Sequence, residues 1–167
     1  MGAPGWFRRR VRSQLRRTSC LRALGDAPTA FAETLTEAAA QPPEYWDKLT
    51  ASVTHPDGQV MVVAEADGQA VGLAFGLFDR DDRSIGHLGG MWVEPAWRRR
   101  GVGRALADAV IDWARERKLR ELALWVTEGN QAATALYAAR GFTATGEEDV
   151  LPSDPSFRVS RMVLILV

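Results

Sequence analysis

The sequence has a single cysteine, and this scarcity excludes several kinds of protein. Cys20 has no second thiol in the chain with which to form an intrachain disulfide, and a metal site built from several cysteines is excluded for the same reason. No apolar run approaches the ~20 residues that a membrane-spanning helix needs. These absences favour a protein of the reducing cytoplasm that has no membrane partner and no metal ion.

Acidic residues are missing from one part of the chain. The formal net charge is zero, yet residues 1–25 hold seven arginines and no acid, which leaves 14 basic residues against 21 acidic residues elsewhere. An arginine-rich, acid-poor start is typical of a transit peptide or of an arm that binds nucleic acid. It also fits an amphipathic first helix, because Phe7, Val11, Leu15 and Thr18 recur near helical spacing. The acidic remainder argues against a dedicated nucleic-acid binder.

The chain of 167 residues, 46% hydrophobic and 25% charged, fits one domain with one sizeable core. We expect helices over about Arg9–Leu24 and Glu44–Ser52, followed by strands over Gln59–Glu65, Ala70–Phe78 and Ser84–Val93. Asp67-Gly68 between the first two strands is a strong hairpin signal, because a type I′ turn needs positive φ at both central residues. The three strands should therefore form an antiparallel meander.

The second half of the chain alternates helical and strand-like segments. We expect a helix over Gly101–Arg117, a strand over Glu121–Val126, a helix over Gln131–Ala139, and closing strands over Phe142–Glu147 and Arg158–Leu166. The strand–helix–strand unit at 84–126 implies a parallel pair with a right-handed crossover. The predicted fold class is α/β, of the α+β kind: a mixed, mostly antiparallel sheet of six to seven strands with helices on both faces.

A tight basic turn, Arg98-Arg99-Arg100-Gly101-Val102-Gly103, leads from the strand at 84–93 into the next helix. The first N–H groups of a helix have no partner within it, and the helix dipole adds partial positive charge, so such a turn attracts an anion. Gly101 and Gly103 also let a phosphate approach the main chain closely. The turn predicts a pyrophosphate site, although glycine for geometry and arginine for solubility would explain it as well. It is neither the dinucleotide fingerprint nor a P-loop.

A second pattern lies one strand downstream. Asn130, Ala133, Leu136, Tyr137, Gly141 and Phe142 form the pattern N-x-x-A-x-x-L-Y-x-x-x-G-F. Together with the basic turn, it resembles the GNAT superfamily of acyl-CoA-dependent N-acyltransferases, over about residues 59–147. The resemblance implies a single acetyltransferase domain over residues 1–167, with the strands at 84–93 and 121–126 splayed apart. The family usually opens with a β-strand, and residues 1–8 have little strand character, so that strand is missing, replaced or very short.

The resemblance implies a function and a set of cofactor contacts. The chain would transfer an acetyl group from acetyl-CoA to a primary amine by direct attack in a ternary complex. The basic turn would bind the CoA pyrophosphate, and the backbone amides of Trp92 and Val93 would contact the pantetheine arm or polarise the thioester carbonyl. Asn130 would contact the same arm, or only cap its helix. The implied cofactor-binding set is Trp92, Val93, Arg98, Arg99, Arg100, Gly101, Val102, Gly103, Arg104, Asn130, Ala133 and Tyr137.

Acyl transfer to an amine needs a neutral amine, donors for the oxyanion and a proton for the departing thiolate. Tyr137 lies where family members often protonate the CoA sulfur and is the candidate acid; packing against the cofactor is the alternative. His87 lies where some members carry a catalytic glutamate and is the first candidate base, since an imidazole of ordinary pKa near ~6.5 accepts a proton at neutral pH. Glu94 could act through a water. Otherwise His87 is a structural strand residue and Glu94 a solvated turn acid.

The acceptor site is expected to come from three segments: the loop after the first helix with Phe31 and Glu33, the second helix with Tyr45 and Trp46, and the late loop Leu151–Pro155. The aromatic residues could equally belong to the core. The acceptor could be a peptide terminus, a lysine, a polyamine, an amino acid or an antibiotic, and the closing strands could pair across a homodimer. Two other functions stay open: a catalytically weak acyl-CoA-binding or sensor domain, and an RNA-associated module.

Overall fold

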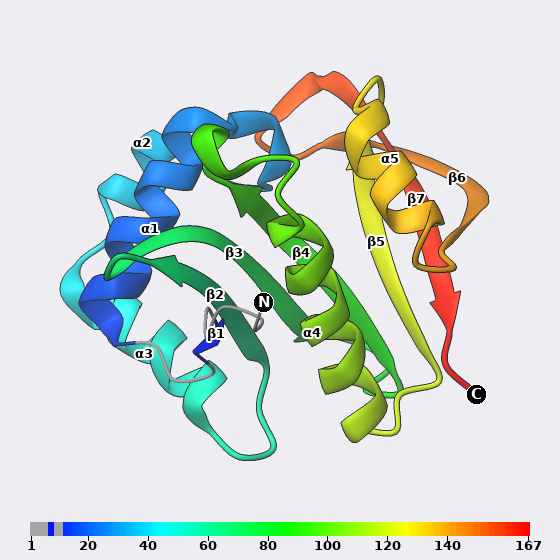
Figure 1. Cartoon of the computed structure of the whole chain (residues 1–167), viewed down its shortest axis with the longest axis horizontal. Coiled ribbons are helices and arrows are strands. Elements are labelled where there is room, and N and C mark those ends of the chain that lie inside the picture. The colour runs from blue at the N-terminus through cyan, green and yellow to red at the C-terminus, as the bar shows by residue number, and fades with distance from the viewer. Residues whose placement is uncertain (1–6, 9–11) are drawn as a thin grey trace.

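The alternating strand-like and helical segments build one twisted sheet with helices on both faces (Figure 1). This computed structural model describes residues 7–8 and 12–167. In chain order the elements are β1 (Phe7–Arg8), α1 (Ser13–Asp26), η1 (Pro28–Ala30), α2 (Leu35–Ala39), α3 (Pro43–Thr54), β2 (Val60–Ala66), β3 (Gln69–Phe78), β4 (Ile85–Val93), η2 (Pro95–Trp97), α4 (Val102–Glu116), β5 (Glu121–Thr127), α5 (Gln131–Ala138), β6 (Thr143–Leu151) and β7 (Asp154–Ile165).

The sheet has seven strands among the described residues, in the order β1-β2-β3-β4-β5-β7-β6. Of these seven described strands, only β4 and β5 pair in parallel, and all other neighbours are antiparallel. The predicted fold class is therefore confirmed. The predicted hairpin is confirmed as well, because Asp67 and Gly68 have φ values of 51° and 76° between β2 and β3.

Strand alternation divides the core into two layers. In β2, Val60 and Val62 pack on the layer that contains α4, whereas Met61 and Val63 pack on the layer built by α1 and α3. A strand buried on both faces has a continuous apolar sequence, so the sequence predicts this strand without showing which face each residue occupies. Figure 1 shows α1, α2 and α3 grouped beside β2 and β3, with α4 along the sheet and α5 beside β7.

The first strand is very short, as one of the expectations allowed. Phe7 pairs with Ala64 and Arg8 with Val63, so β1 extends the sheet edge by two residues. The described helix α1 begins at Ser13, and the expected helix start at Arg9 lies outside the described residues, as does Val11 of the predicted apolar stripe.

The predicted apolar stripe of the first helix is wrong at Thr18, which is exposed. The helix instead buries Arg16, Ser19, Cys20, Ala23 and Leu24. Arg16 is only 5% exposed because its guanidinium lies over the Phe75 ring, 5.1 Å from the centroid, and its Nη1 donates to the Leu49 carbonyl. A cation with these partners can occupy a core position, and the small residues beside it let the helix approach the sheet.

Two further elements differ from the expectation. Helix α2 was not predicted, yet its capping box is complete: Thr34 Oγ1 accepts from the Glu37 amide at 3.2 Å and Glu37 Oε2 accepts from the Thr34 amide at 2.8 Å. The prediction of a late loop over Leu151–Pro155 is wrong, because β6 and β7 form a hairpin in which Leu151 already pairs with Asp154. Pro155 is tolerated near the start of β7, where β5 does not yet run alongside: pairing with β5 begins at Val159.

The strands β4 and β5 separate from each other after a short contact, as expected. Their parallel pairing comprises Ile85 with Glu121, Gly86 with Leu122 and His87 with Ala123. Beyond His87 the two strands diverge, and Figure 1 shows the gap widening toward the N-terminal end of α4. A β-bulge accompanies the divergence: Gly90, with φ of 56°, and Met91 together face the single β3 residue Ala74. A bulge bends and twists its strand, so it turns β4 away from β5.

Candidate active site

The gap between β4 and β5 contains a cavity of about 1060 Å³ that is lined from both faces of the sheet. On the α4 side the lining includes Leu124 and Tyr137, and on the opposite side it includes His87 and Trp125. Neighbouring residues of a strand point to opposite faces, so β5 contributes to both halves of the cavity. Two reactants that enter from opposite faces of the sheet would meet in the gap.

The basic turn forms one end of this cavity. Gly101 is the N-cap of α4 with φ of 82°, and the first helical hydrogen bond runs from the Ala105 amide to the Gly101 carbonyl at 3.0 Å. The amides of residues 102–104 therefore have no helical partners, which is the arrangement that binds a phosphate. The cavity is lined by Arg98, Arg99, Gly101, Gly103 and Arg104.

Two members of the predicted turn lie away from the cavity. Val102 is 1% exposed and packs in the core, so only its backbone can serve an anion. The Arg100 guanidinium lies over the Trp97 ring, 5.2 Å from its centroid. Arg98 is held by Val93, whose carbonyl accepts from Nε at 2.9 Å, and by an ion pair with Asp26. That ion pair fixes Arg98 at the cavity and offsets part of its charge.

Of the two predicted strand-end residues, the structure brings Val93 to the cavity and keeps Trp92 out of it. The Glu94 amide donates to the Val71 carbonyl at 2.9 Å, and antiparallel pairs alternate, so the amide and carbonyl of Val93 point away from β3. By the same alternation the Trp92 amide belongs to the ladder with β3. The Trp92 side chain is buried, and its Nε1 donates to Asp26 at 2.8 Å.

The N-x-x-A-x-x-L-Y-x-x-x-G-F pattern folds as a helix with both of its caps. Asn130 caps α5, because its side chain accepts from the Ala133 amide at 3.1 Å. At the other end the Phe142 amide donates to the Tyr137 carbonyl at 3.1 Å, and the Gly141 amide donates to the Ala138 carbonyl at 3.0 Å, with Gly141 at φ of 90°. These two bonds define a Schellman motif, and the Tyr137 and Phe142 rings make its accompanying apolar contact, 5.8 Å between centroids.

The cap also separates the two roles predicted for Asn130. Replacing Asn130 with alanine should lower the free energy of unfolding by about 1 kcal/mol, the usual cost of a lost N-cap. Asn130→Asp retains an accepting oxygen and should keep most of this stability, while it loses the amide donor. Urea unfolding and acetyl-CoA titration of both variants test this. Normal affinity in Asn130→Asp would restrict the residue to capping, and unchanged stability in Asn130→Ala would contradict the cap.

Tyr137 reaches the cavity from α5 with a buried ring. Its hydroxyl donates to Met91 Sδ at 3.7 Å, beside the bulge in β4. Burial raises the pKa of Tyr137 to about 12, so the hydroxyl keeps its proton at neutral pH and acts there as a donor. Leu136 and Ala133 line the same side of the cavity.

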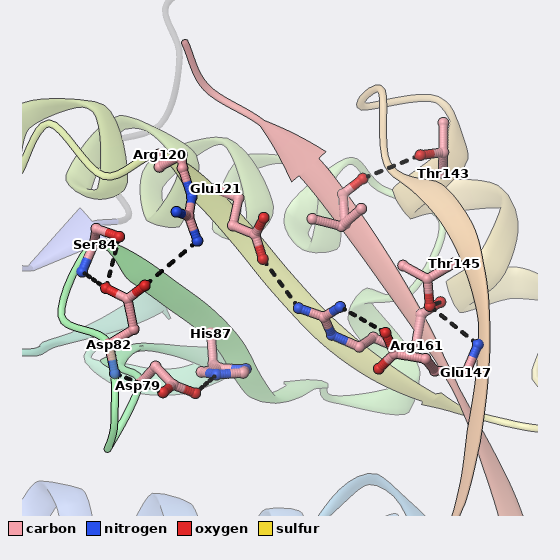
Figure 2. Close-up of polar contacts among 11 residues, drawn as sticks. Asp79, Asp82, Ser84, His87, Arg120, Glu121, Thr143, Thr145, Glu147 and Arg161 are labelled. Atoms are coloured by element: carbon pink, nitrogen blue, oxygen red, sulfur yellow. Dashed lines mark hydrogen bonds and ion pairs between the residues drawn. The ribbon is translucent and has the colours of Figure 1, made fainter.

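His87 lines the opposite side of the cavity and is hydrogen-bonded to a residue that the sequence had not indicated. Its Nε2 lies 2.7 Å from Oδ2 of Asp79, which follows the end of β3 (Figure 2). The pKa of Asp79 is lowered to about 2. The largest cause is the hydrogen bond with His87, and hydrogen bonds from two backbone amides add to it. The signal in the sequence was weak: Asp79 stands diagonally across the hairpin from His87, and only the register reveals this.

The structure does not bring Glu94 into the cavity. Its carboxylate is ion-paired with Arg22 of α1, and Arg22 also donates to the Ala70 carbonyl at 3.1 Å. Two of the seven N-terminal arginines, Arg16 and Arg22, thus have structural roles within the fold.

The predicted acceptor segments are only partly brought together. Phe31, Leu151 and Pro152 line the cavity, whereas Glu33, Tyr45 and Trp46 do not. Two hydrogen bonds hold the segment around η1 across this side: Thr127 Oγ1 donates to the Thr29 carbonyl and Ser153 Oγ to the Phe31 carbonyl, each at 2.7 Å. Sequence reasoning missed the lining residues Arg80, Trp125 and Asp149.

Within residues 7–8 and 12–167, no helix is long and apolar enough to cross a membrane, and no group of histidine, cysteine, aspartate or glutamate side chains is arranged to hold a metal ion.

Comparison with protein families gives one match over most of the chain. The sequence profile described as "Acetyltransferase (GNAT) family" matches residues 25–142. Among curated proteins, the aminoglycoside N(6')-acetyltransferase type 1 of Stenotrophomonas maltophilia is 36% identical over 105 residues, which cover 59% of this chain and 69% of that protein.

Solved structures agree with this match. The ribosomal-protein-alanine N-acetyltransferase of Brucella melitensis is 27% identical with a TM-score of 0.78, and the alignment covers 96% of this chain and 99% of that one. The protein yncA of Salmonella typhimurium, solved with its cofactor acetyl-CoA, has a TM-score of 0.75 at 20% identity, with coverage of 96% and 93%. The second likeness concerns the fold alone.

Proposed function

The chain belongs to the GNAT family of acetyltransferases, and on that premise we propose that it transfers the acetyl group of acetyl-CoA to a primary amine by direct attack in a ternary complex. One observation carries the proposal. The unpartnered amides at the start of α4, the Tyr137 hydroxyl and the His87 imidazole all belong to one cavity between splayed strands.

Each residue would have a separate task. The amides of residues 102–104 and the guanidinium groups of Arg98, Arg99 and Arg104 bind the CoA pyrophosphate. The amide of Val93 orients the pantetheine arm. His87 takes a proton from the attacking nitrogen as the nitrogen–carbon bond forms, and Tyr137 donates a hydrogen bond to the sulfur as the carbon–sulfur bond breaks. No covalent intermediate on the protein is needed.

The relatives define the acceptors with which to begin. The Stenotrophomonas maltophilia protein is named for aminoglycosides and the Brucella melitensis protein for an alanine of a ribosomal protein. We propose a test with an aminoglycoside, a peptide with N-terminal alanine, a lysine peptide and a polyamine, measuring the release of free CoA. Release that depends on one amine supports the function. Tight binding of acetyl-CoA without release for any amine would instead support the sensor domain.

His87→Gln should lower kcat by about 10²-fold near pH 7, the lower end of the effect of general base catalysis. The loss should shrink as the pH rises, because a growing fraction of the amine is then neutral without help. Steady-state rates from pH 6 to pH 10 with parent and variant measure this. A constant ratio of the two rates over that range would return His87 to a structural role.

A further inference from the structure

His87 occupies a special position on β4. It is the last residue paired with β5 before the two strands separate, so its side chain stands at the closed end of the gap. The imidazole is 27% exposed and lines the cavity, while the Asp79 carboxylate beside it is not part of the lining. Only Nε2 is hydrogen-bonded within the described residues, and Nδ1 is left without a partner there.

The Asp79 carboxylate is held in place by the turn that joins β3 to β4. Its Oδ1 accepts from the Asp81 amide at 2.9 Å and from the Asp82 amide at 3.0 Å, and its own amide donates to the Ile85 carbonyl at 3.0 Å. One carboxylate oxygen therefore organises the turn, and the other is presented to Nε2 of His87 at 2.7 Å. The backbone amides of the turn therefore fix the orientation of the carboxylate, and with it the direction in which Oδ2 points.

We propose that Asp79 is a positioning residue that keeps the proton of neutral His87 on Nε2 and leaves Nδ1 to accept a proton from the acceptor amine. This inference rests on the proposed acetyl transfer. In the reaction the nitrogen–carbon bond forms, the proton of the amine passes to Nδ1, the carbon–sulfur bond breaks, and the thiolate leaves beside the Tyr137 hydroxyl. Asp79 holds the resulting imidazolium without taking its proton.

The charges around the pair support this assignment. The low pKa of Asp79, about 2, keeps the carboxylate ionised at neutral pH, and an ionised carboxylate only accepts hydrogen bonds. The shared proton must then sit on Nε2. Arg80 lines the same cavity. On the neighbouring strands, Glu121 is engaged by Arg161 at 3.0 Å, so it does not compete for the imidazole (Figure 2).

Asp79→Asn tests the proposal with a minimal change of shape. The asparagine oxygen can still accept from the amides of the turn, while its NH₂ group would donate to Nε2 and move the histidine proton to Nδ1. A histidine in the wrong tautomer cannot act as the base. We expect kcat at pH 7 to fall by the same factor as in His87→Gln, with unchanged acetyl-CoA affinity. The variant carrying both changes should be no slower than His87→Gln, because the two residues act as one unit.

Nitrogen-15 NMR of the two histidines provides a readout independent of turnover. His87 should change from the Nε2–H to the Nδ1–H tautomer in Asp79→Asn, whereas His55, whose Nδ1 accepts from the Asp57 amide at 3.1 Å, serves as an internal reference. The control is Asp82→Asn in the same turn, since Asp82 accepts from the amide and hydroxyl of Ser84 at 2.8 and 2.7 Å and does not bond His87. Asp82→Asn should leave the tautomer and kcat unchanged.

Three results would overturn the proposal: an unchanged His87 tautomer in Asp79→Asn, full activity of that variant, or additive losses in the double variant. Failure of the acetyl-transfer function looks different, because the parent protein itself would then release no CoA with any amine. In that case the NMR comparison still decides whether Asp79 sets the tautomer of His87.

Discussion

Replacing Gly103 with valine is expected to weaken acetyl-CoA binding by about 10²–10⁴-fold while the protein stays folded. A phosphate that approaches the start of α4 receives hydrogen bonds from backbone amides, and a hydrogen bond to a charged group contributes about 1.5–3 kcal/mol. Loss of two such bonds costs about 3–6 kcal/mol, which corresponds to that change in the dissociation constant. Calorimetric titration with acetyl-CoA and with CoA measures it.

The protein itself has room for a Cβ at this position. A Cβ on Gly103 would lie 3.5 Å from a methyl group of Leu136 and 3.6 Å from one of Val93, both ordinary contact distances. Gly103 is in the first turn of α4, where a residue other than glycine restricts the unfolded chain and is not disfavoured by the helix. Thermal unfolding of the variant should therefore resemble that of the parent.

Gly101 gives a second variant with a matched control. Its φ of 82° is unfavourable for valine, and a Cβ there meets nothing within 4 Å, so the cost of Gly101→Val is conformational. Gly68 in the β2–β3 turn has φ of 76° and equally open surroundings, but it does not line the cavity. Gly101→Val and the control Gly68→Val should lose a similar amount of stability, and of these two only Gly101→Val should also lose acetyl-CoA affinity. Unchanged affinity in both Gly101→Val and Gly103→Val would refute the pyrophosphate site.

The parts of the fold and of the site that are encoded locally could be predicted from the sequence. The Asp67-Gly68 turn, the Asn130 cap and the Gly141 stop depend on a few consecutive residues, and the structure has all three. The capping box of α2 is equally local: Thr34 and Glu37 have the required spacing, and this signature would have predicted the helix.

The parts that depend on register or packing could not be predicted in this way. The hydrogen bond between Asp79 and His87 depends on the exact register of β3 and β4. Whether the amide of Val93 or that of Trp92 faces the cavity depends on which of them is hydrogen-bonded to β3. Glu94 looks like a solvated acid until α1 places Arg22 against it. These contacts depend on how strands pair and how helices pack on the sheet, so no local sequence pattern predicts them.

The largest effect expected from a side chain concerns Tyr137. Tyr137→Phe removes the hydroxyl oxygen, whose only hydrogen bond in the described structure is with Met91 Sδ. The packing of the ring on Phe142 should therefore survive. The variant should bind acetyl-CoA about as well as the parent and have a kcat lower by ~10²-fold or more, the size expected when a hydrogen-bond donor to the transition state is lost. Pre-steady-state release of CoA and calorimetric titration separate the two quantities.

The pKa of Tyr137 refines how this residue would act. A phenol with a pKa of about 12 is a weaker acid than a thiol of ordinary pKa near ~8.5, so complete proton transfer to the thiolate is uphill. Tyr137 would therefore stabilise the developing negative charge mainly through a hydrogen bond that strengthens in the transition state. Such a bond affects kcat and leaves ground-state affinity unchanged.

The acyl donor and a second tyrosine make this role testable. Donors with a more acidic thiol need less help, so the ratio of parent to Tyr137→Phe rates should decrease as the thiol pKa of the donor falls. Tyr45→Phe is the matched control, because Tyr45 is the only other tyrosine and does not line the cavity; it should be fully active. Equal rates for Tyr137→Phe and the parent, or a loss confined to acetyl-CoA affinity, would make Tyr137 a packing residue, and the thiolate would then take its proton from water.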